Sequence, residues 1–515
     1  MKRFNIDPRL LAAITAGTLI ILPLAACTTP TDTSVTTAQT QAVTETTPVL
    51  TSEATFTGKD LEVGYDESEA ETITLNGSSA TSSSSSVNIS GSVITIMGKG
   101  TYIISGTLDD GYIVVDAGDS DDIRLILKGA NITSSDYAAI YCLNADNVFI
   151  TLEDGTENSL VNSGEYDSKD DNSVDGAIFA KTDVTINGAG SLTVSSTAHG
   201  IVGKDDVNIT GGVITIESEK DGIQANDSVA IQNATIDITC GKDGIQADND
   251  DDPTQGYIYI LSGNVTIDAD DDGITATSTL QIDDGTINIQ NSYEGLEGQN
   301  IIINGGNISI ASSDDAINAV SASSGASMQA DGTSSIVISG GSVYVRSEGD
   351  GIDSNGTFEM SGGTLTVMGP TRGGNGSLDV NGTASITGGT VVMAGTSDMA
   401  TNFTNATQGA ILINTGSQSE GTEITVTDTS GNVIIQATAD CSYQTVLVSS
   451  PNLVKGNKYT VSAGNFSETV DLSDNIYGSG SGFGAGGFTG GGPGGNPGGS
   501  PEGNPGGGPG GRGGF

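Results

Sequence analysis

A short motif recurs along the middle of the chain: an acidic residue, then glycine or alanine, then an aliphatic residue. It starts at eight positions, with histidine in place of the acid at the second: Asp175, His199, Asp221, Asp243, Asp272, Glu294, Asp315 and Asp350. The intervals are 24, 22, 22, 29, 22, 21 and 35 residues, and the two longest contain insertions. Self-similarity at a period of about 22 residues predicts a solenoid, because each unit must pack on its neighbours to bury its apolar side.

One unit, residues 221–242, indicates what kind of structure repeats. Apolar residues alternate with polar ones in three short runs: Ile223 and Ala225, then Val229 and Ile231, then Ile236, Ile238 and Cys240. A period of two residues predicts strands, and no segment sustains the period of an α-helix. Three strands per coil, each with an inward apolar column, predict an all-β fold: a right-handed parallel β-helix with coils about 4.8 Å apart.

The corners between strands carry Asn or Gly. Asn187, Asn233 and Asn304 are predicted at equivalent corners, where Asn tolerates left-handed backbone angles and can bond to the residue above it. We expect the glycines of the recurring motif for the same backbone reason.

The ends of the chain differ from the repeats in composition. Lys2 and Arg3, an apolar run and the sequence Leu24-Ala25-Ala26-Cys27 predict a lipoprotein signal peptide over residues 1–27. Cys27 would then be the lipidated first residue of an exported protein that is anchored to the cell membrane and exposed on the surface. The remaining predicted segments are a flexible linker (28–55), the β-helix (56–405), a small C-terminal antiparallel β unit (406–475) and a disordered Gly/Pro-rich tail (476–515).

The chain is strongly acidic, with 64 Asp and Glu against 17 Lys and Arg and a net charge of −47. This charge argues against nucleic acid as a partner, and against contact with anionic membranes except through the lipid anchor. Trp is absent, which weakens any sugar-stacking platform built on that residue. Three widely spaced cysteines, Cys142, Cys240 and Cys441, predict buried free thiols rather than disulfides or a zinc site. We expect a monomer.

The acidic corners suggest a metal. Residues one repeat apart lie above one another in a stacked coil, so two columns form: Glu294, Asp315 and Asp350, and beside them Glu297, Asn318 and Asp353. Carboxylates about 5 Å apart repel unless a cation lies between them, and Ca²⁺ takes about six to eight oxygen ligands. We therefore predict calcium ligands among Asp272, Glu294, Glu297, Asp314, Asp315, Asn318, Asp350 and Asp353. The alternative, that Asp-Gly merely ends strands, is stronger for early corners such as Asp175 and Asp221.

Several segments resemble one family of bacterial surface proteins, the carbohydrate-binding domain-containing proteins. They are SYEGLEG from Ser292, DDAINA from Asp314, KDGIQA from Lys220 and again from Lys242, DDGITA from Asp271, and LVSSPNLVKGNKYTVSAGN from Leu447. The resemblance spans roughly residues 50–475 and implies a right-handed parallel β-helix similar to pectate lyases of polysaccharide lyase family nine. It also implies binding of calcium and of plant polysaccharides, either acidic pectin or cellulose, without clear lyase activity. Ala316 departs from the family motif, which has glycine there.

Three functions remain open at this stage. The first is non-catalytic, calcium-dependent binding of acidic polysaccharide such as polygalacturonate, with cellulose as a further ligand. The second is a calcium-dependent pectate lyase, in which Lys220 or Lys242 beside the acidic corners removes a proton; Arg346 and Arg372 are further candidates. The third is a structural or adhesive spacer that calcium only stiffens.

Overall fold

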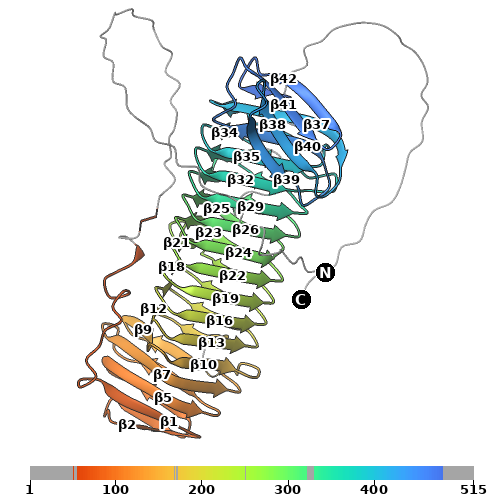
Figure 1. The fold of residues 1–515 in the computed structure, drawn as a ribbon. Coiled ribbons are helices and arrows are strands. Elements are labelled where there is room, and N and C mark those ends of the chain that lie inside the picture. Colours follow the sequence, from red (N-terminus) through yellow and green to blue (C-terminus); the bar gives the residue numbers. More distant parts are fainter. Residues whose placement is uncertain are drawn as a thin grey trace, which may run out of the picture. The chain divides into compact units, whose positions relative to one another are not determined.

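The computed structural model describes residues 50–51, 55–167, 169, 172–249, 251–321 and 330–479. The predicted lipidation site, Cys27, lies outside these residues, as does almost all of the Gly/Pro-rich tail. The described residues form parallel strands stacked in successive coils, as Figure 1 shows, and the predicted all-β solenoid is confirmed. Within the described residues, no helix is long and apolar enough to cross a membrane.

Each coil contributes one strand to each of three faces. Face 1 consists of β4 (Val93–Ile96), β6 (Tyr112–Asp116), β8 (Ile140–Asn144), β11 (Gly176–Ala180), β14 (His199–Gly203), β17 (Ile223–Ala225), β20 (Ile245–Ala247), the first parts of β23 (Ile274–Ile282) and β25 (Leu296–Ile303), β27 (Ile317–Ala319), β30 (Ile352–Ser354) and β33 (Asp379–Val380). This face carries the recurring motif.

Face 2 follows face 1 along each coil. It consists of the first parts of β5 (Gly100–Leu108) and β7 (Asp122–Ser134), β9 (Asn147–Leu152), β12 (Asp183–Gly188), β15 (Asp206–Ile209), β18 (Ser228–Ile231), β21 (Tyr257–Ile260), the last parts of β23 and β25, β28 (Ser335–Ile338), β31 (Thr357–Met360), β34 (Ala384–Ile386) and β36 (Asn405–Ala406).

Face 3 completes each coil with longer strands. It consists of the last parts of β5 and β7, then β10 (Glu157–Asn162), β13 (Ser191–Ser196), β16 (Val213–Ser218), β19 (Thr235–Cys240), β22 (Asn264–Ala269), β24 (Thr286–Asn291), β26 (Asn307–Ser312), β29 (Ser342–Ser347), β32 (Thr364–Met368) and β35 (Thr390–Gly395).

The core consists of apolar columns that run from coil to coil. On face 1 the inward residues pair in exact succession and are all fully buried: Ile201, Ile223, Ile245, Ile274, Leu296, Ile317 and Ile352. Burying each such side chain contributes about 2 kcal/mol, and it does so only when the next coil is in place. Cys142, Cys240 and Cys441 are buried free thiols, as the sequence predicted.

The motif glycines are required by close approach, not by backbone angles, so our expectation for them was wrong. Gly222 and Gly244 do not have a φ in the left-handed region. A Cβ added to Gly222 would lie 2.4 Å from Ile238 Cγ2 and 2.6 Å from the carbonyl oxygen of Gly244 in the next coil. Asn233 does adopt the predicted left-handed angle, with φ of 55°.

The ends of the solenoid change to antiparallel pairing. At the N-terminal end β1 (Glu71–Gly77) pairs with β2 (Ala80–Ser82), and β3 (Val87–Ser90) pairs with β4. At the C-terminal end β40 (Tyr443–Ser450) pairs antiparallel with β35 and β37 (Gly409–Gln418), and β43 (Ile476–Tyr477) pairs with β37. A separate antiparallel sheet has the strand order β39 (Val433–Thr438), β38 (Glu423–Asp428), β41 (Lys458–Ala463), β42 (Phe466–Asp471).

The first described residues lie against face 2 rather than in a coil. The main chain of Leu50 makes two hydrogen bonds to the side-chain amide of Gln281, of 2.8 and 2.9 Å. Phe56 packs on Tyr259, with ring centroids 6.2 Å apart. Asp60 is buried and accepts a hydrogen bond of 2.5 Å from Thr185. This N-terminal segment therefore crosses several coils.

Candidate functional site

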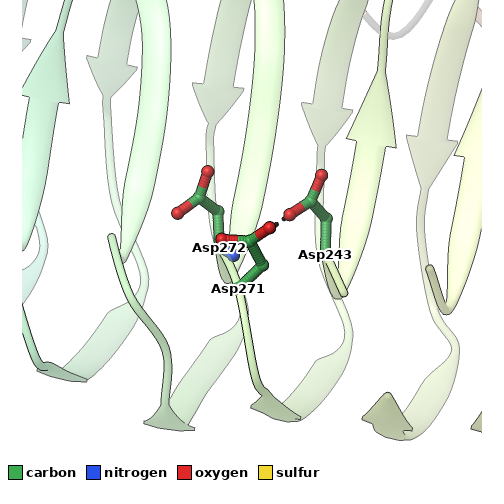
Figure 2. A group of neighbouring side chains, drawn as sticks. All are labelled: Asp243, Asp271 and Asp272. Carbon is green, nitrogen blue, oxygen red and sulfur yellow. Dashed lines mark hydrogen bonds between the residues drawn. The ribbon is translucent and has the colours of Figure 1, made fainter. Parts of the chain in front are cut away.

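The corner carboxylates form a ladder along face 1. Asp243 Oδ1 accepts a hydrogen bond of 3.1 Å from the backbone N–H of Asp272, as Figure 2 shows. Asp272 Oδ1 does the same for Glu294 at 3.0 Å, and Asp315 Oδ1 for Asp350 at 2.5 Å. Each of these side chains therefore satisfies a backbone donor of the following coil, which explains in part why acidic residues recur here.

The second predicted column lies beside this ladder and changes in character along the solenoid. The strand register stacks Gln224, Gln246, Thr275, Glu297, Asn318, Asp353 and Asp379. Gln224 donates to Gln246 over 3.1 Å, and Gln246 donates to Asp243 over 2.9 Å. Amides thus solvate the corner carboxylates in the early coils, whereas from Glu297 onward the column consists of carboxylates with one amide, Asn318.

A histidine balances the charge at the early end of the corner ladder. His199 Nδ1 lies 2.9 Å from Asp221 Oδ2, and its Nε2 lies 3.5 Å from Asp175 Oδ2. Burial lowers the pKa of His199, but the two carboxylates outweigh burial and raise it above its ordinary value. A protonated imidazole therefore places one positive charge between two acidic corners.

A lysine contributes the positive charge at the middle corners. One carboxylate oxygen from each of Asp243, Asp271 and Asp272 lies within 4.8 Å of the others. Lys242 Nζ lies 2.9 Å from Asp271 Oδ2, so this cluster already contains a cation (the three carboxylates are drawn in Figure 2). Asp272, which we predicted as a ligand together with Glu294, belongs to this group instead.

The later corners have no such cation. One carboxylate oxygen from each of Asp315, Asp350 and Asp353 lies within 4.8 Å of the others. Among the described residues, none of the ion pairs with Lys, Arg or His involves these three. Burial, and then the mutual repulsion of the carboxylates, raises the pKa of Asp315 and Asp350 to about 7 and that of Asp353 to about 8. Binding of a proton or a cation would therefore stabilise the three carboxylates.

Asn318 joins this trio to the two glutamates of the preceding coil. Its Nδ2 donates to Glu294 Oε2 over 2.7 Å and to Glu297 Oε2 over 3.4 Å. The side chain is only 8% exposed, and its Oδ1 accepts no hydrogen bond from the described residues. Burial, and then Glu297, raises the pKa of Glu294 to about 8. Asn318 Oδ1 is therefore a buried hydrogen-bond acceptor without a donor in the described part of the chain, next to crowded carboxylates.

The residues present fit a hard divalent cation. A Cβ added to Gly349 would lie 2.4 Å from Asp314 Oδ1 and 2.5 Å from Asp315 Oδ1, so this glycine leaves room for both carboxylates. The available donors are carboxylate and amide oxygens, which suit Ca²⁺ and not a soft metal. The structure thus groups Asp315, Asp350 and Asp353, with Asn318, Glu294 and Glu297 adjoining; Asp314 lies at the Gly349 side.

Asp379 was missed by sequence reasoning. It pairs in register with Asp353, and burial raises its pKa. Gly376 takes the corner position of its coil and donates its N–H to Asp350 Oδ1, so the acidic corner that marked the other coils is absent. The sequence does contain one signal for Asp379: it directly follows an apolar residue, the buried Leu378, just as Asp353 follows Ile352.

The predicted lyase bases lie elsewhere on the same face. Lys220 Nζ lies 3.5 Å from Asp175 and lines an open cleft of about 420 Å³ with Tyr166 and Glu219. The hydrogen bond to Asp271 raises the pKa of Lys242, which favours its protonated form. Arg346 donates over 2.6 Å to the carbonyl oxygen of Asp440 in the C-terminal region, so it has a structural role.

Comparisons with known proteins find a family model, a relative and a solved structure that are similar to parts of this chain. A family model described as carbohydrate-binding domain-containing protein matches residues 90–333. Residues 90–333 are thus similar to this family. The matched region includes the corners from Asp175 to Asp315, whereas Asp350, Asp353 and Asp379 follow it.

Two relatives bear similar descriptions. A carbohydrate-binding domain-containing protein of Acetivibrio thermocellus is 38% identical over 129 residues, which are 24% of this chain and 45% of that protein. The match therefore spans less than half of that relative's length. A solved structure described as a polysaccharide lyase-like protein from C. thermocellum, gadolinium derivative, is 33% identical and aligns over 46% of this chain and 92% of that one, with a TM-score of 0.42.

Proposed function

We propose that this protein binds acidic polysaccharide through Ca²⁺ held on face 1 at the coils that contain Asp315 and Asp350. One observation carries the proposal: three carboxylates within 4.8 Å of one another adjoin the unsatisfied Oδ1 of Asn318, and no basic side chain of the described residues pairs with them. Asp315, Asp350, Asp353 and Asn318 would hold the ion, with Glu294, Glu297, Asp314 and Asp379 close by. The bound ion would supply positive charge that attracts uronate carboxylates.

The net charge of the chain makes a bound cation necessary for such a ligand. A chain with a net charge of −47 repels a polyanion over its whole surface. A bare carboxylate cluster would make this repulsion strongest at the site itself. The match of residues 90–333 to a family model described as carbohydrate-binding supports a sugar polymer as the ligand rather than another anion.

Retention on immobilised polygalacturonate, in calcium and in chelator, tests the proposal. Wild-type protein should be retained only with calcium, and the combined Asp315→Asn, Asp350→Asn and Asp353→Asn substitutions should abolish retention. This loss is informative because removing three negative charges would otherwise improve binding to a polyanion. Asp243→Asn with Asp272→Asn, at the cluster that already contains the Lys242 ammonium, is the matched control and should be retained normally. Retention that is indifferent to chelator would overturn the proposal.

The two other candidate functions give different results in the same assay. A calcium-dependent lyase would release unsaturated uronides from polygalacturonate, and Lys220→Ala would stop release without affecting binding. A structural spacer would gain thermal stability from calcium but would not be retained on polygalacturonate or on cellulose. Retention on cellulose that survives the triple substitution would assign uncharged glycans to another surface.

The lipid anchor and the surface location form part of the same proposal. Export with lipidation at Cys27 would present the solenoid to extracellular polymers. Metabolic labelling with a fatty-acid analogue should mark the wild-type protein and not the Cys27→Ala variant, which should be released into the medium.

A further inference from the structure

A second stack of residues, one position before the corner, borders the candidate metal site. The backbone N–H of Asp271 donates to the carbonyl of Lys242 over 3.4 Å, Tyr293 donates to Asp271 over 2.7 Å, and Asp314 donates to Tyr293 over 2.9 Å. Tyr293 therefore has a fixed place between Asp271 and Asp314 of the neighbouring coils. It directly precedes Glu294, whose carboxylate is bound by Asn318.

Tyr293 is unusual among the large apolar side chains that the described residues expose. It is 47% exposed, and the others of comparable exposure are all aliphatic or Met: Leu61, Val63, Met97, Val213, Val433 and Val454. Two aromatic residues on face 1 are covered, since Tyr141 is 2% exposed and Phe179 is fully buried. One exposed apolar residue needs no explanation in itself. Its position beside the candidate metal site is what makes this one informative.

A carboxylate borders the ring of Tyr293. Asp314 lies beside Tyr293 in the next coil, since its backbone N–H donates to the carbonyl of Tyr293, and it directly precedes Asp315. A hydrogen bond to the Asp314 carboxylate, and then the charge of that group, raises the pKa of Tyr293 to about 12. A flat apolar surface with a polar rim of carboxylates suits a pyranose ring, which has apolar C–H faces and hydroxyl groups at its edge.

We propose that Tyr293 is a stacking platform for one sugar ring of an acidic polysaccharide whose carboxylate is bound at the adjacent calcium site. This proposal rests on the proposed function and deepens it, because it assigns the selection of a sugar polymer to a residue that is not a metal ligand. Calcium alone does not discriminate among polyanions. An aromatic platform next to the ion favours a polymer of rings over a polyanion of similar charge without rings.

Substitutions at Tyr293 with two different polyanions test this assignment. Tyr293→Ala should weaken calcium-dependent binding of polygalacturonate by about tenfold, as expected for loss of one aromatic contact. Binding of poly-glutamate, and the affinity for calcium in the absence of polymer, should not change. Tyr293→Phe should bind polygalacturonate nearly as wild type does, and Val213→Ala, at an exposed apolar residue on face 3, is the matched control.

The absence of Trp from the chain permits an independent measurement. In the Tyr293→Trp variant the new indole would be the only one, and oligogalacturonate added in calcium should change its emission, whereas oligo-glutamate should not. The inference is overturned if Tyr293→Ala binds both polymers like wild type, if it weakens both equally, or if the indole emission does not respond to the sugar. Calcium-dependent retention of the wild type in these same assays tests the proposed function separately.

Discussion

Asn318 Nδ2 donates a hydrogen bond of 2.7 Å to Glu294 Oε2 in the preceding coil, while Asn318 Oδ1 stays buried without a donor from the described residues. The partly positive amide nitrogen therefore faces the glutamates. The partly negative Oδ1 has no hydrogen-bond donor among the residues that the structure describes and could coordinate a cation.

Removing this amide should impair calcium binding more than it impairs folding. Asn318→Ala deletes one neutral ligand and the donor that solvates Glu294, and loss of such a buried hydrogen bond costs about 1–3 kcal/mol. Calorimetric titration should show calcium affinity reduced by about tenfold or more, the lower end of that range. Gln246→Ala, in the same column three coils earlier, should leave calcium affinity unchanged. Equal affinities for wild type and Asn318→Ala would exclude Asn318 as a ligand.

Gly349 offers a steric test that removes no carboxylate from the chain. In Gly349→Ala the added Cβ would collide with Asp314 Oδ1 and Asp315 Oδ1, at 2.4 and 2.5 Å, and would push these groups out of position. Calcium should then stabilise the variant less than it stabilises wild type in thermal melts. Gly58→Ala, where no atom lies within 4 Å of the new Cβ, is the control. An undiminished calcium effect in Gly349→Ala would place the ion elsewhere.

Calcium affinity should rise with pH. Glu294 and Asp353 have folded pKa values of about 8, and Asp315 and Asp350 of about 7. Their unfolded values are about 4, so the folded protein without calcium holds more protons, and its stability falls as pH rises from about 4 to about 8. Calcium displaces these protons. We expect tighter binding at pH 8 than at pH 6, with proton release that titrations in buffers of different ionisation enthalpy would detect; binding independent of pH would contradict this.

Protonation of His199 should change the stability of the protein independently of calcium. Its folded pKa is raised, so its contribution is fully present below its unfolded value of about 6.5 and is lost as pH rises through the folded value. In chelator, urea unfolding of wild type and His199→Gln should therefore differ most at acidic pH and converge at alkaline pH. A difference that grows with pH would mean that the imidazole is neutral between Asp175 and Asp221.

The inward and outward positions of β17 permit a direct comparison. Ile223 is fully buried, whereas Gln224 next to it faces outward and bonds to Gln246. Ile223→Asp should be several kcal/mol less stable than Gln224→Asp, because it buries a carboxylate without a partner. Soluble yield and denaturation midpoints check this, and equal values would contradict the register.

The sequence was sufficient to predict the features that depend on the repeat. Glu297 and Asn318 are 21 residues apart, which is the length of one coil, so the sequence predicted that they lie side by side. The structure pairs them directly. Asp379 was not predicted because its coil has Gly376, and not an acidic residue, at the corner. Asn187 and Asn304 were assigned to the corner of Asn233, but the register places them one residue earlier, and Asn187 bonds to the carbonyl of Asp60 instead.

Contacts outside the repeat could not be predicted in this way. The position of residues 50–62 depends on partners such as Gln281, 231 residues from Leu50, and Thr185, 125 residues from Asp60. No local pattern in the segment encodes these pairings. The tight cluster of Asp315, Asp350 and Asp353 likewise could not be predicted without the side-chain directions. From sequence spacing alone, Asp272 and Asp350 were predicted equally as calcium ligands.

The docking of Leu50 on Gln281 also sets an order of events during synthesis. Successive coils can form as the chain grows, since each needs only its predecessor. Leu50 cannot find its partner until β23 has been made and has joined the stack, 231 residues later. The earliest segment of the described chain can therefore settle only after the coils up to β23 have formed, and it closes over coils that formed while it was still unattached.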